Sequence, residues 1–404
     1  MLRLTDKNET DPVIRWLMTE ARKRTDPCEF LEAFAGELRA AGVEVSRVST
    51  GVPILHPQIF SFSGLWQLGK GTTERSFRST PQDFATMSNS PIRIAYEGGG
   101  PVRCDLAAPP QEGEYAILAD LRRDGLTDYI VYSVPFADGS HKALSFATGR
   151  HGGFDRDELA LLEATIPAVA FNLEVQALRR TARTLLDTYV GQQSGGRVLE
   201  GQIRRGAGET IRAVIWLCDL RGFTNLSETL PRDALIDLLN SYFGPMCDAV
   251  TAQGGEILKF IGDAMLAIFP IGAGAGQTCG AALRAAELAE ASLAKENQRR
   301  RGLGLPLIDY GLALHVGEVL YGNIGSDTRL DFTVIGPAVN LTARIESLCR
   351  QLGRTLLLSS DFAKACGISA DSLGRFPLKG IAADQEIFVP AHEGLTRSVD
   401  GIGL

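Results

Sequence analysis

The chain has 404 residues, of which 45% are hydrophobic and 22% are charged, and its formal net charge is −7 at pH 7. This length exceeds what one hydrophobic core usually organises, so we expect two domains joined by a linker. The acidic balance excludes a general affinity for nucleic acid, so any polyanion must be bound through local cations or metal ions.

Nothing in the sequence predicts a membrane span or a secreted protein. No stretch approaches about 20 consecutive apolar residues, and the N-terminal segment is charged. The seven cysteines are scattered, odd in number and without a Cys-x-x-Cys pair. This usage predicts reduced thiols, no structural zinc and a cytoplasmic location.

Residues 1–155 predict a small α+β domain. Helices are expected to begin at Asp11-Pro12 and at Asp26-Pro27, because a capping carboxylate precedes a proline at both places. The weakly patterned residues 51–110 predict loops and short strands. Alternating or apolar runs predict strands at 43–49, 115–121, 128–135 and 142–148.

Residues 156–207 predict a helical connector and linker. Asp155 and Glu158 have capping-box spacing before the helix, and Pro167 is expected to kink or interrupt it. One apolar stripe is explained equally well by packing on its own domain and by pairing between two chains. It comprises Leu159, Leu162, Ile166, Val169 and Leu173. A second stripe predicts pairing between two chains; it comprises Phe171, Val175, Leu178, Ala182 and Leu185.

Residues 208–404 predict a second α+β domain in a βααβ-type order, with a central sheet and helices on one face. A buried strand is expected to end at Asp219, and the run from Gly255 to Pro270 predicts two strands around a Gly262-Asp263 turn. Helices are expected at 231–250, 276–300 and 338–351, and further strands at 308–316, 319–323, 331–335 and 355–360.

Two aspartates in this domain suggest chemistry. Asp219 ends a strand and Asp263 lies in a tight turn, so the alternatives are a helix cap and a turn residue. Two carboxylates at strand ends are also suited to Mg²⁺, which prefers oxygen ligands and keeps water for a phosphate substrate.

Three separated motifs occur in order: CDLRGFTNLSE, GGEILKFIGDAMLAIF and DFTVIGPAVNLTARIE. Together, over about residues 211–390, they resemble the class III adenylyl cyclase catalytic domain, which has a ferredoxin-like fold. The stretch from Val134 to Val175 loosely resembles the end of a GAF domain, a small sensor fold. The resemblance implies a cytoplasmic adenylyl cyclase that converts ATP to cyclic AMP and pyrophosphate, with an unknown signal acting on the N-terminal domain.

The resemblance implies roles for the residues around the two aspartates. Asp219, Asp263 and the carbonyl of Leu220 would bind two Mg²⁺ ions per site, for which Mn²⁺ can substitute. Phe223 and Thr224 would open a helix whose free N–H groups meet the triphosphate.

Base selection is implied to rest on Lys259 and Thr333. The ammonium of Lys259 only donates hydrogen bonds, which suits N1 of adenine and not the N1–H of guanine. Most adenylyl cyclases have aspartate where Thr333 stands, so the sequence resembles a subset with threonine, some of whose members respond to bicarbonate. A threonine hydroxyl discriminates less sharply because it accepts and donates. Asp331 is an alternative acceptor on the same strand.

The remaining implied contacts concern the ribose and the phosphates. Asn340 would orient the ribose and Arg344, four residues later on the same helix face, would stabilise charge on the α-phosphate. The alternative for Arg344 is a surface ion pair with Glu346. Arg329 and Lys379 are weaker candidates for the triphosphate.

In this family the metal-binding aspartates come from one catalytic domain, and the lysine, threonine, asparagine and arginine come from its partner. The resemblance therefore implies a homodimer with two shared sites. The rival hypotheses are a guanylyl cyclase and a catalytically silent regulatory module. A diguanylate cyclase is disfavoured because the turn is Gly262-Asp263-Ala264, and the run from Gly272 to Gly276 lacks the ending of a P-loop.

Overall fold

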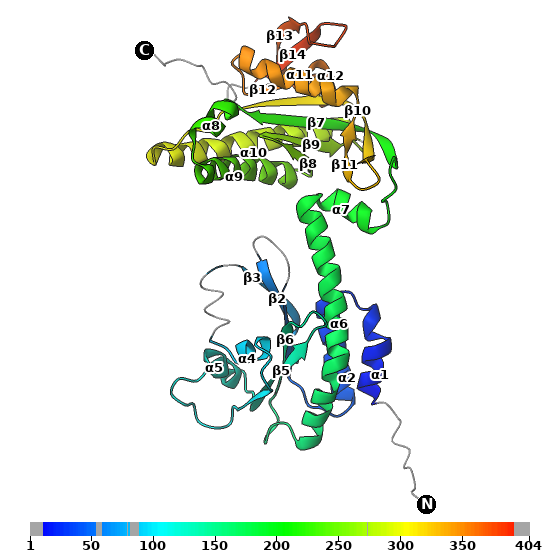
Figure 1. Cartoon of the computed structure of the whole chain (residues 1–404), viewed down its shortest axis with the longest axis vertical. Helices are drawn as coiled ribbons and strands as arrows, with labels where there is room; N and C mark the ends of the chain where they lie inside the picture. Colours follow the sequence, from blue (N-terminus) through cyan, green and yellow to red (C-terminus); the bar gives the residue numbers. More distant parts are fainter. Residues whose placement is uncertain (1–10, 54–58, 79, 81–88, 273, 392–404) are drawn as a thin grey trace, which may run out of the picture. The chain divides into compact units, whose positions relative to one another are not determined.

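The computed structural model describes residues 11–53, 59–78, 80, 89–272 and 274–391. The chain forms two compact units, Met1–Leu185 and Leu186–Leu404, which are drawn in Figure 1. Among the described helices, none is both long and apolar enough to cross a bilayer.

The helices of the first unit begin where the aspartates predict. Asp11 accepts a hydrogen bond from the Val13 N–H at 2.8 Å, and Asp26 accepts one from the Cys28 N–H at 2.8 Å. The elements are α1 (Pro12–Thr19), η1 (Ala21–Lys23), α2 (Pro27–Ala40), β1 (Arg47–Pro53), β2 (Ile59–Gln67), β3 (Gly71–Arg78), α4 (Ile92–Tyr96), β4 (Val102–Asp105), α5 (Ala116–Arg123), β5 (Asp128–Pro135), β6 (His141–Thr148) and α6 (Arg156–Tyr189).

The six strands form one antiparallel sheet in the order β3-β2-β1-β6-β5-β4. Helices α1, α2 and α6 pack on one face, and α4 and α5 pack on the other. This arrangement makes the unit a small α+β domain, and its likeness to a GAF domain stays a prediction.

Three expectations for this unit were wrong in detail. The strand expected at 43–49 begins at Arg47, and the segment 51–110 contains the long strands β2 and β3, with residues 54–58, 79 and 81–88 outside the described residues. The strand expected at 115–121 is helix α5, because Leu118 and Leu121 are buried on one side with helical spacing.

Helix α6 starts with the predicted capping box. The Glu158 N–H donates to Asp155 at 2.9 Å, and the Asp155 N–H donates to Glu158 at 2.8 Å. Pro167 does not interrupt the helix. The first apolar stripe packs into the core of its own unit, whereas Phe171, Leu178 and Leu185 of the second stripe are exposed.

The second unit contains α7 (Gln192–Leu199), β7 (Gly208–Leu220), α8 (Phe223–Thr229), α9 (Arg232–Ala252), β8 (Glu256–Ile261), β9 (Ala264–Pro270), α10 (Ala275–Gly302), β10 (Tyr310–Gly325), β11 (Leu330–Ile335), α11 (Pro337–Gln351), β12 (Leu356–Ser359), α12 (Ser360–Cys366), β13 (Ala370–Phe376) and β14 (Gln385–Pro390). The sheet has the order β13-β14-β12-β10-β7-β9-β8, and β11 pairs with β10. The two strands expected at 308–323 are one, because β10 pairs with β7 without a break from Tyr310 to Gly322.

Helices cover both faces of this sheet, so the expectation of helices on one face was wrong. Alternate residues of β7 point to opposite sides, and the side of Trp216 packs against α9 and α10. The opposite side packs against α11, through Ile345 and Leu348. Figure 1 shows α9 and α10 on one side of the strands and α11 on the other.

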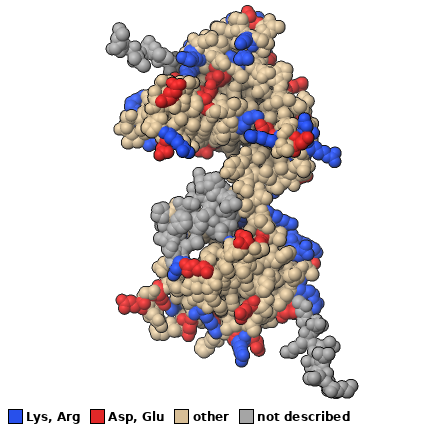
Figure 2. Space-filling model, in the orientation of Figure 1, with Lys and Arg blue, Asp and Glu red and all other residues tan. Residues whose placement is uncertain are grey.

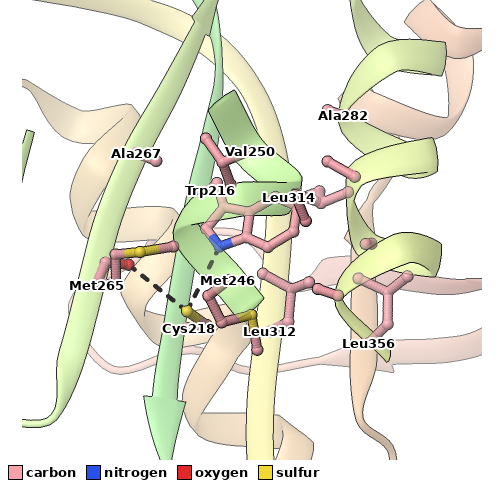
Figure 3. Close-up of a cluster of buried hydrophobic side chains, with 14 of the residues drawn as sticks. Trp216, Cys218, Met246, Val250, Met265, Ala267, Ala282, Leu312, Leu314 and Leu356 are labelled. Atoms are coloured by element: carbon pink, nitrogen blue, oxygen red, sulfur yellow. Dashed lines mark hydrogen bonds between the residues drawn. The ribbon is translucent and has the colours of Figure 1, made fainter. Parts of the chain in front are cut away.

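The core beneath the end of β7 is dense and apolar. Trp216 and Cys218 are fully buried, and the indole N–H of Trp216 donates to the Cys218 sulfur at 3.4 Å (Figure 3). Leu312 and Leu314 of β10 and Met246 of α9 complete the packing around them. Because Asp219 follows Cys218 directly, this core fixes the backbone that carries its carboxylate.

Candidate active site

Asp219 is held at the end of β7 by pairing on both sides. Asp219 lies opposite Gly311 of β10, and Cys218 lies opposite Met265 of β9. The side chain of Leu220 is buried, and β7 ends there. The chain then turns at Gly222, whose φ of 71° favours glycine, and enters α8.

Asp263 occupies the predicted two-residue turn between β8 and β9. Ile261 pairs with Ala264, and Gly262 has a φ of 65°. The turn brings the Asp263 carboxyl beside that of Asp219. Burial, then the hydrogen bond with Asp263 and then its charge raise the pKa of Asp219 to about 6.

A third acidic side chain, Glu346, faces this pair, and sequence analysis did not identify it as a site residue. It lies on α11, and burial, followed by the charge of Asp219, raises its pKa to about 7. An added Cβ at Gly311, opposite Asp219, would collide with a Glu346 carboxyl oxygen, so a larger residue there would displace the Glu346 side chain. The sequence signal that could have identified Glu346 was its position in the third motif, two residues after Arg344.

The chemistry of this pair fits a divalent cation. Two neighbouring carboxylates repel each other, and the raised pKa of Asp219 records that repulsion together with burial. No cluster of three or more candidate metal-ligating side chains occurs among the described residues. Mg²⁺ is usually held by one or two carboxylates plus water and substrate phosphates, so a pair suffices.

Lys259 lies on β8, next to an irregularity. The register with β9 shifts between Ile257 and Lys259, which is the signature of a β-bulge and redirects the side chains that follow. The Lys259 ammonium lies 3.5 Å from an oxygen of Asp331 on β11. Asp331 therefore contacts Lys259 in the single chain and is not free to act alone as an acceptor for a base.

Thr333 lies two residues further along β11, opposite Gly322 of β10. Only 3% of its surface is exposed, and its hydroxyl has no hydrogen-bond partner among the described residues. Buried hydroxyls are almost always hydrogen-bonded, so Thr333 lacks a partner that a water or a ligand group would supply.

Asn340 and Arg344 project from the exposed side of α11. Ala338, Thr342 and Ile345 are buried on the opposite side of the helix. The ion pair of Arg344 with Glu346 that sequence analysis left open is not found in the described part of the chain. Arg344 is also absent from the charges that act on Asp219.

The candidate phosphate contacts lie at the surface. Thr224 is exposed at the start of α8, and Phe223 packs partly against the core. Arg329 lies between β10 and β11, where its carbonyl accepts from the Ser326 N–H at 2.8 Å, and Lys379 lies between β13 and β14. The roles of Arg329 and Lys379 stay predictions.

Residues 209–389 match the family model described as the adenylate and guanylate cyclase catalytic domain. A guanylyl cyclase of known structure, Cya2, is 33% identical over 47% of this chain and 98% of its own, with a TM-score of 0.41. Through its second unit the chain belongs to the adenylate and guanylate cyclase family.

Other relatives align with two fifths to about half of the chain. The adenylyl cyclase CyaB of P. aeruginosa is 30% identical over 47% of this chain and 100% of that structure, with a TM-score of 0.43. An adenylate cyclase of Anabaena cylindrica is 39% identical over 166 residues, which are 40% of this chain and 32% of that protein. The chain thus spans about a third of the length of this curated relative.

Within one cyclase domain, the site residues form two separate groups. Asp219, Asp263 and Glu346 are neighbours, and Lys259 is joined to Asp331 on the strand of Thr333. On the face shown in Figure 2, acidic and basic side chains are interspersed over both units, and that face carries no broad basic surface among its described residues.

Proposed function

We propose that the chain is an adenylyl cyclase that converts ATP to 3′,5′-cyclic AMP and pyrophosphate at sites shared by two copies of its cyclase domain. The observation that carries the choice of ATP is an ammonium donor, Lys259, which contacts Asp331 on the strand that also carries the buried, unpartnered hydroxyl of Thr333. Adenine presents an acceptor at N1 and a donor at its amino group, which complements this pair.

Asp219, Asp263 and the Leu220 carbonyl would hold two Mg²⁺ ions per site, with Mn²⁺ as a substitute. Bound there, the ions would supply charge stabilisation for the triphosphate and lower the pKa of the attacking ribose hydroxyl. Glu346 lies beside them with a raised pKa, and a bound cation would favour its charged form.

The reaction is an in-line displacement in which the ribose 3′-oxygen bonds to the α-phosphorus and the bond to pyrophosphate breaks. Asn340 would orient the ribose, and Arg344 would stabilise charge on the α-phosphate through its planar guanidinium. Phe223 and Thr224 would offer backbone N–H groups to the triphosphate, with Arg329 and Lys379 as additional cations. Positioning and charge stabilisation supply most of the rate.

The site would be completed by a second copy of the chain. Asn340 and Arg344 are exposed, and Arg344 is not among the charges that act on Asp219 within one chain. A homodimer would place these residues of one copy against the aspartates of the other and form two equivalent sites. We further propose that the first unit regulates the reaction, and that the protein acts in a reducing compartment such as the cytoplasm, since all seven cysteines are free.

The test is cyclic nucleotide formation by the full chain with ATP or GTP, in Mg²⁺ and in Mn²⁺. Asp263→Asn is the inactive variant, and Asp371→Asn on β13 is the matched control. Cyclic AMP from the wild type and the control, and not from Asp263→Asn, is the expected result. Cyclic GMP as the main product would favour the guanylyl cyclase, and no product from a dimeric protein would favour a silent module.

A further inference from the structure

Helix α7 is bonded to two strands of the cyclase domain through one buried carboxylate, that of Glu256. The Ser194 N–H and hydroxyl donate to one carboxylate oxygen at 2.9 and 2.5 Å, and the Tyr321 hydroxyl donates to the other at 2.6 Å. Ser194, Glu256 and Tyr321 are 0%, 4% and 1% exposed. We call these three residues the Glu256 cluster.

The Glu256 cluster needs all of its donors. A carboxylate removed from water is costly unless hydrogen bonds compensate its charge, and the loss of one donor leaves part of that charge unpaired. Burial, and then the hydrogen bond to Glu256, raise the pKa of Tyr321 well above its ordinary value, so the phenol remains a donor at neutral pH.

Packing around the cluster holds α7 firmly. The Arg197 guanidinium lies over the Tyr321 ring at 4.8 Å and donates to Glu209 of β7 at 2.6 Å. Gly191 has a φ of 96°, and an added Cβ there would lie 3.2 Å from the Ile257 carbonyl oxygen. The chain therefore passes from the end of α6 into α7 in close contact with β8.

Glu256 joins β8 to β10, and each of these strands is connected to one of the two proposed base-selecting residues. Glu256 is the first residue of β8, which carries Lys259. Tyr321 on β10 pairs with Val334 of β11, which is the neighbour of Thr333, and its ring meets Phe332 edge-on at 4.8 Å. A shift of α7 would therefore move β8 relative to β11, and with it Lys259 relative to Thr333.

We propose that Glu256 is a positioning residue that sets the spacing of Lys259 and Thr333 through Ser194 and Tyr321, and so links base recognition to helix α7, which follows α6 in the chain. This inference rests on the proposed adenylyl cyclase function. Its signature is a change in base selectivity and in KM, because the cluster acts on the base and leaves the metal-binding aspartates in place.

The experiment compares Tyr321→Phe and Ser194→Ala with Tyr242→Phe in the full chain. Tyr242 is the matched control because it is equally buried and its hydroxyl interacts with the Cys218 thiol and not with a carboxylate. The kcat and KM for ATP and GTP are measured, together with amide hydrogen exchange across the chain.

We expect Tyr321→Phe and Ser194→Ala to raise the KM for ATP roughly tenfold, the scale of a lost hydrogen bond to a charged group, with a smaller change in kcat. The ATP-to-GTP preference should fall, and exchange should quicken in residues 192–199 and 256–261. The double variant should lose less than the sum of the single losses, because both donors serve the same carboxylate.

The proposal is overturned if Tyr321→Phe matches Tyr242→Phe in selectivity and in exchange. It is also overturned if exchange quickens evenly over the whole second unit, which would show a contribution to stability alone. A wild type that forms no cyclic nucleotide refutes the proposed function, and local exchange then still decides whether the cluster holds β8 to α7.

Discussion

Lys259 and Thr333 differ in whether their polar groups have a partner within the chain. Lys259 contacts Asp331, whereas the buried Thr333 hydroxyl contacts no described partner. A base that enters between them would gain a hydrogen bond at Thr333 at no cost in broken bonds, and would compete with Asp331 for Lys259. Selectivity should therefore depend most on the charge at position 259.

Replacement of Lys259 by glutamate should invert this charge. The Lys259→Glu variant is expected to lower the ATP-to-GTP ratio of kcat/KM by roughly tenfold to a hundredfold, because a carboxylate accepts from the N1–H of guanine and repels N1 of adenine. Steady-state kinetics with both nucleotides measure the ratio. Lys364→Glu, on the exposed surface of α12, is the control, and an unchanged ratio at position 259 would exclude Lys259 from base recognition.

Asp219 should destabilise the metal-free protein at neutral pH. Its pKa is raised to about 6, above the ordinary value of 3.8, so the folded state disfavours the charged form. The destabilisation is absent below about pH 4 and grows as the pH rises through about 6. Asp219→Asn should therefore raise the melting temperature at pH 7.5 without divalent ions.

The expected gain for Asp219→Asn is roughly 1–2 kcal/mol, reduced from the full pKa shift because solvent screens a half-buried carboxyl. Thermal unfolding at pH 4 and pH 7.5, with and without Mg²⁺, measures it. Mg²⁺ should stabilise the wild type and Asp371→Asn more than Asp219→Asn. Equal stabilisation of all three would contradict cation binding at this pair.

The site could be predicted largely from its motifs, because those residues are local to strand ends and turns. Asp219, Asp263, Lys259 and Asn340 lie on the predicted elements. Glu346 lies within the third motif, but its burial beside the aspartates and the contacts of the Glu256 cluster join residues far apart in sequence, and no local pattern encodes them. Burial is the largest effect on Cys28 and Cys104 and raises the pKa of both thiols, which disfavours reactive thiolates at these two positions.

At the level of elements, local signals were reliable where one physical effect dominated. The caps at Asp11, Asp26 and Asp155 were confirmed because a carboxylate before a helix has few alternatives. Helix α5 was mistaken for a strand because a short apolar segment does not distinguish the two periods. The extent of β10 and the layer of α11 depend on tertiary pairing, which no local pattern encodes.

The exposed stripe of α6 is expected to pair two chains. Phe171 is 46% exposed and Leu178 is 64% exposed, although both belong to a continuous apolar series. Leu178→Glu should weaken the dimer roughly tenfold or more, the scale of one leucine removed from an apolar contact, and lower activity in parallel. Light scattering and activity over a dilution series measure both effects.

Arg183→Glu serves as the matched control for Leu178→Glu. Arg183 is exposed on the same helix and does not belong to the stripe. If both variants dimerise like the wild type, the stripe is not a pairing surface, and its exposed leucine and phenylalanine require a different occupant.

At the level of the whole molecule, the proposed sharing of sites between two copies predicts complementation. Asp219→Asn and Arg344→Ala should each be inactive alone, because each lacks one half of every site. A verified heterodimer of the two variants should recover up to about half of the wild-type activity per dimer, from its one complete site. The absence of recovery in purified heterodimers would contradict shared sites.

The hairpin of β8 and β9 carries Lys259 and Asp263 together on one short segment of chain. In the proposed dimer these two residues serve opposite sites, which has a consequence for inheritance. In a cell expressing wild-type and altered copies equally, a defect at either residue would leave roughly half of the activity, because each mixed dimer keeps one site. A single allele altered at both would disable every mixed dimer and leave roughly a quarter, so two recessive changes would become dominant when carried on the same hairpin.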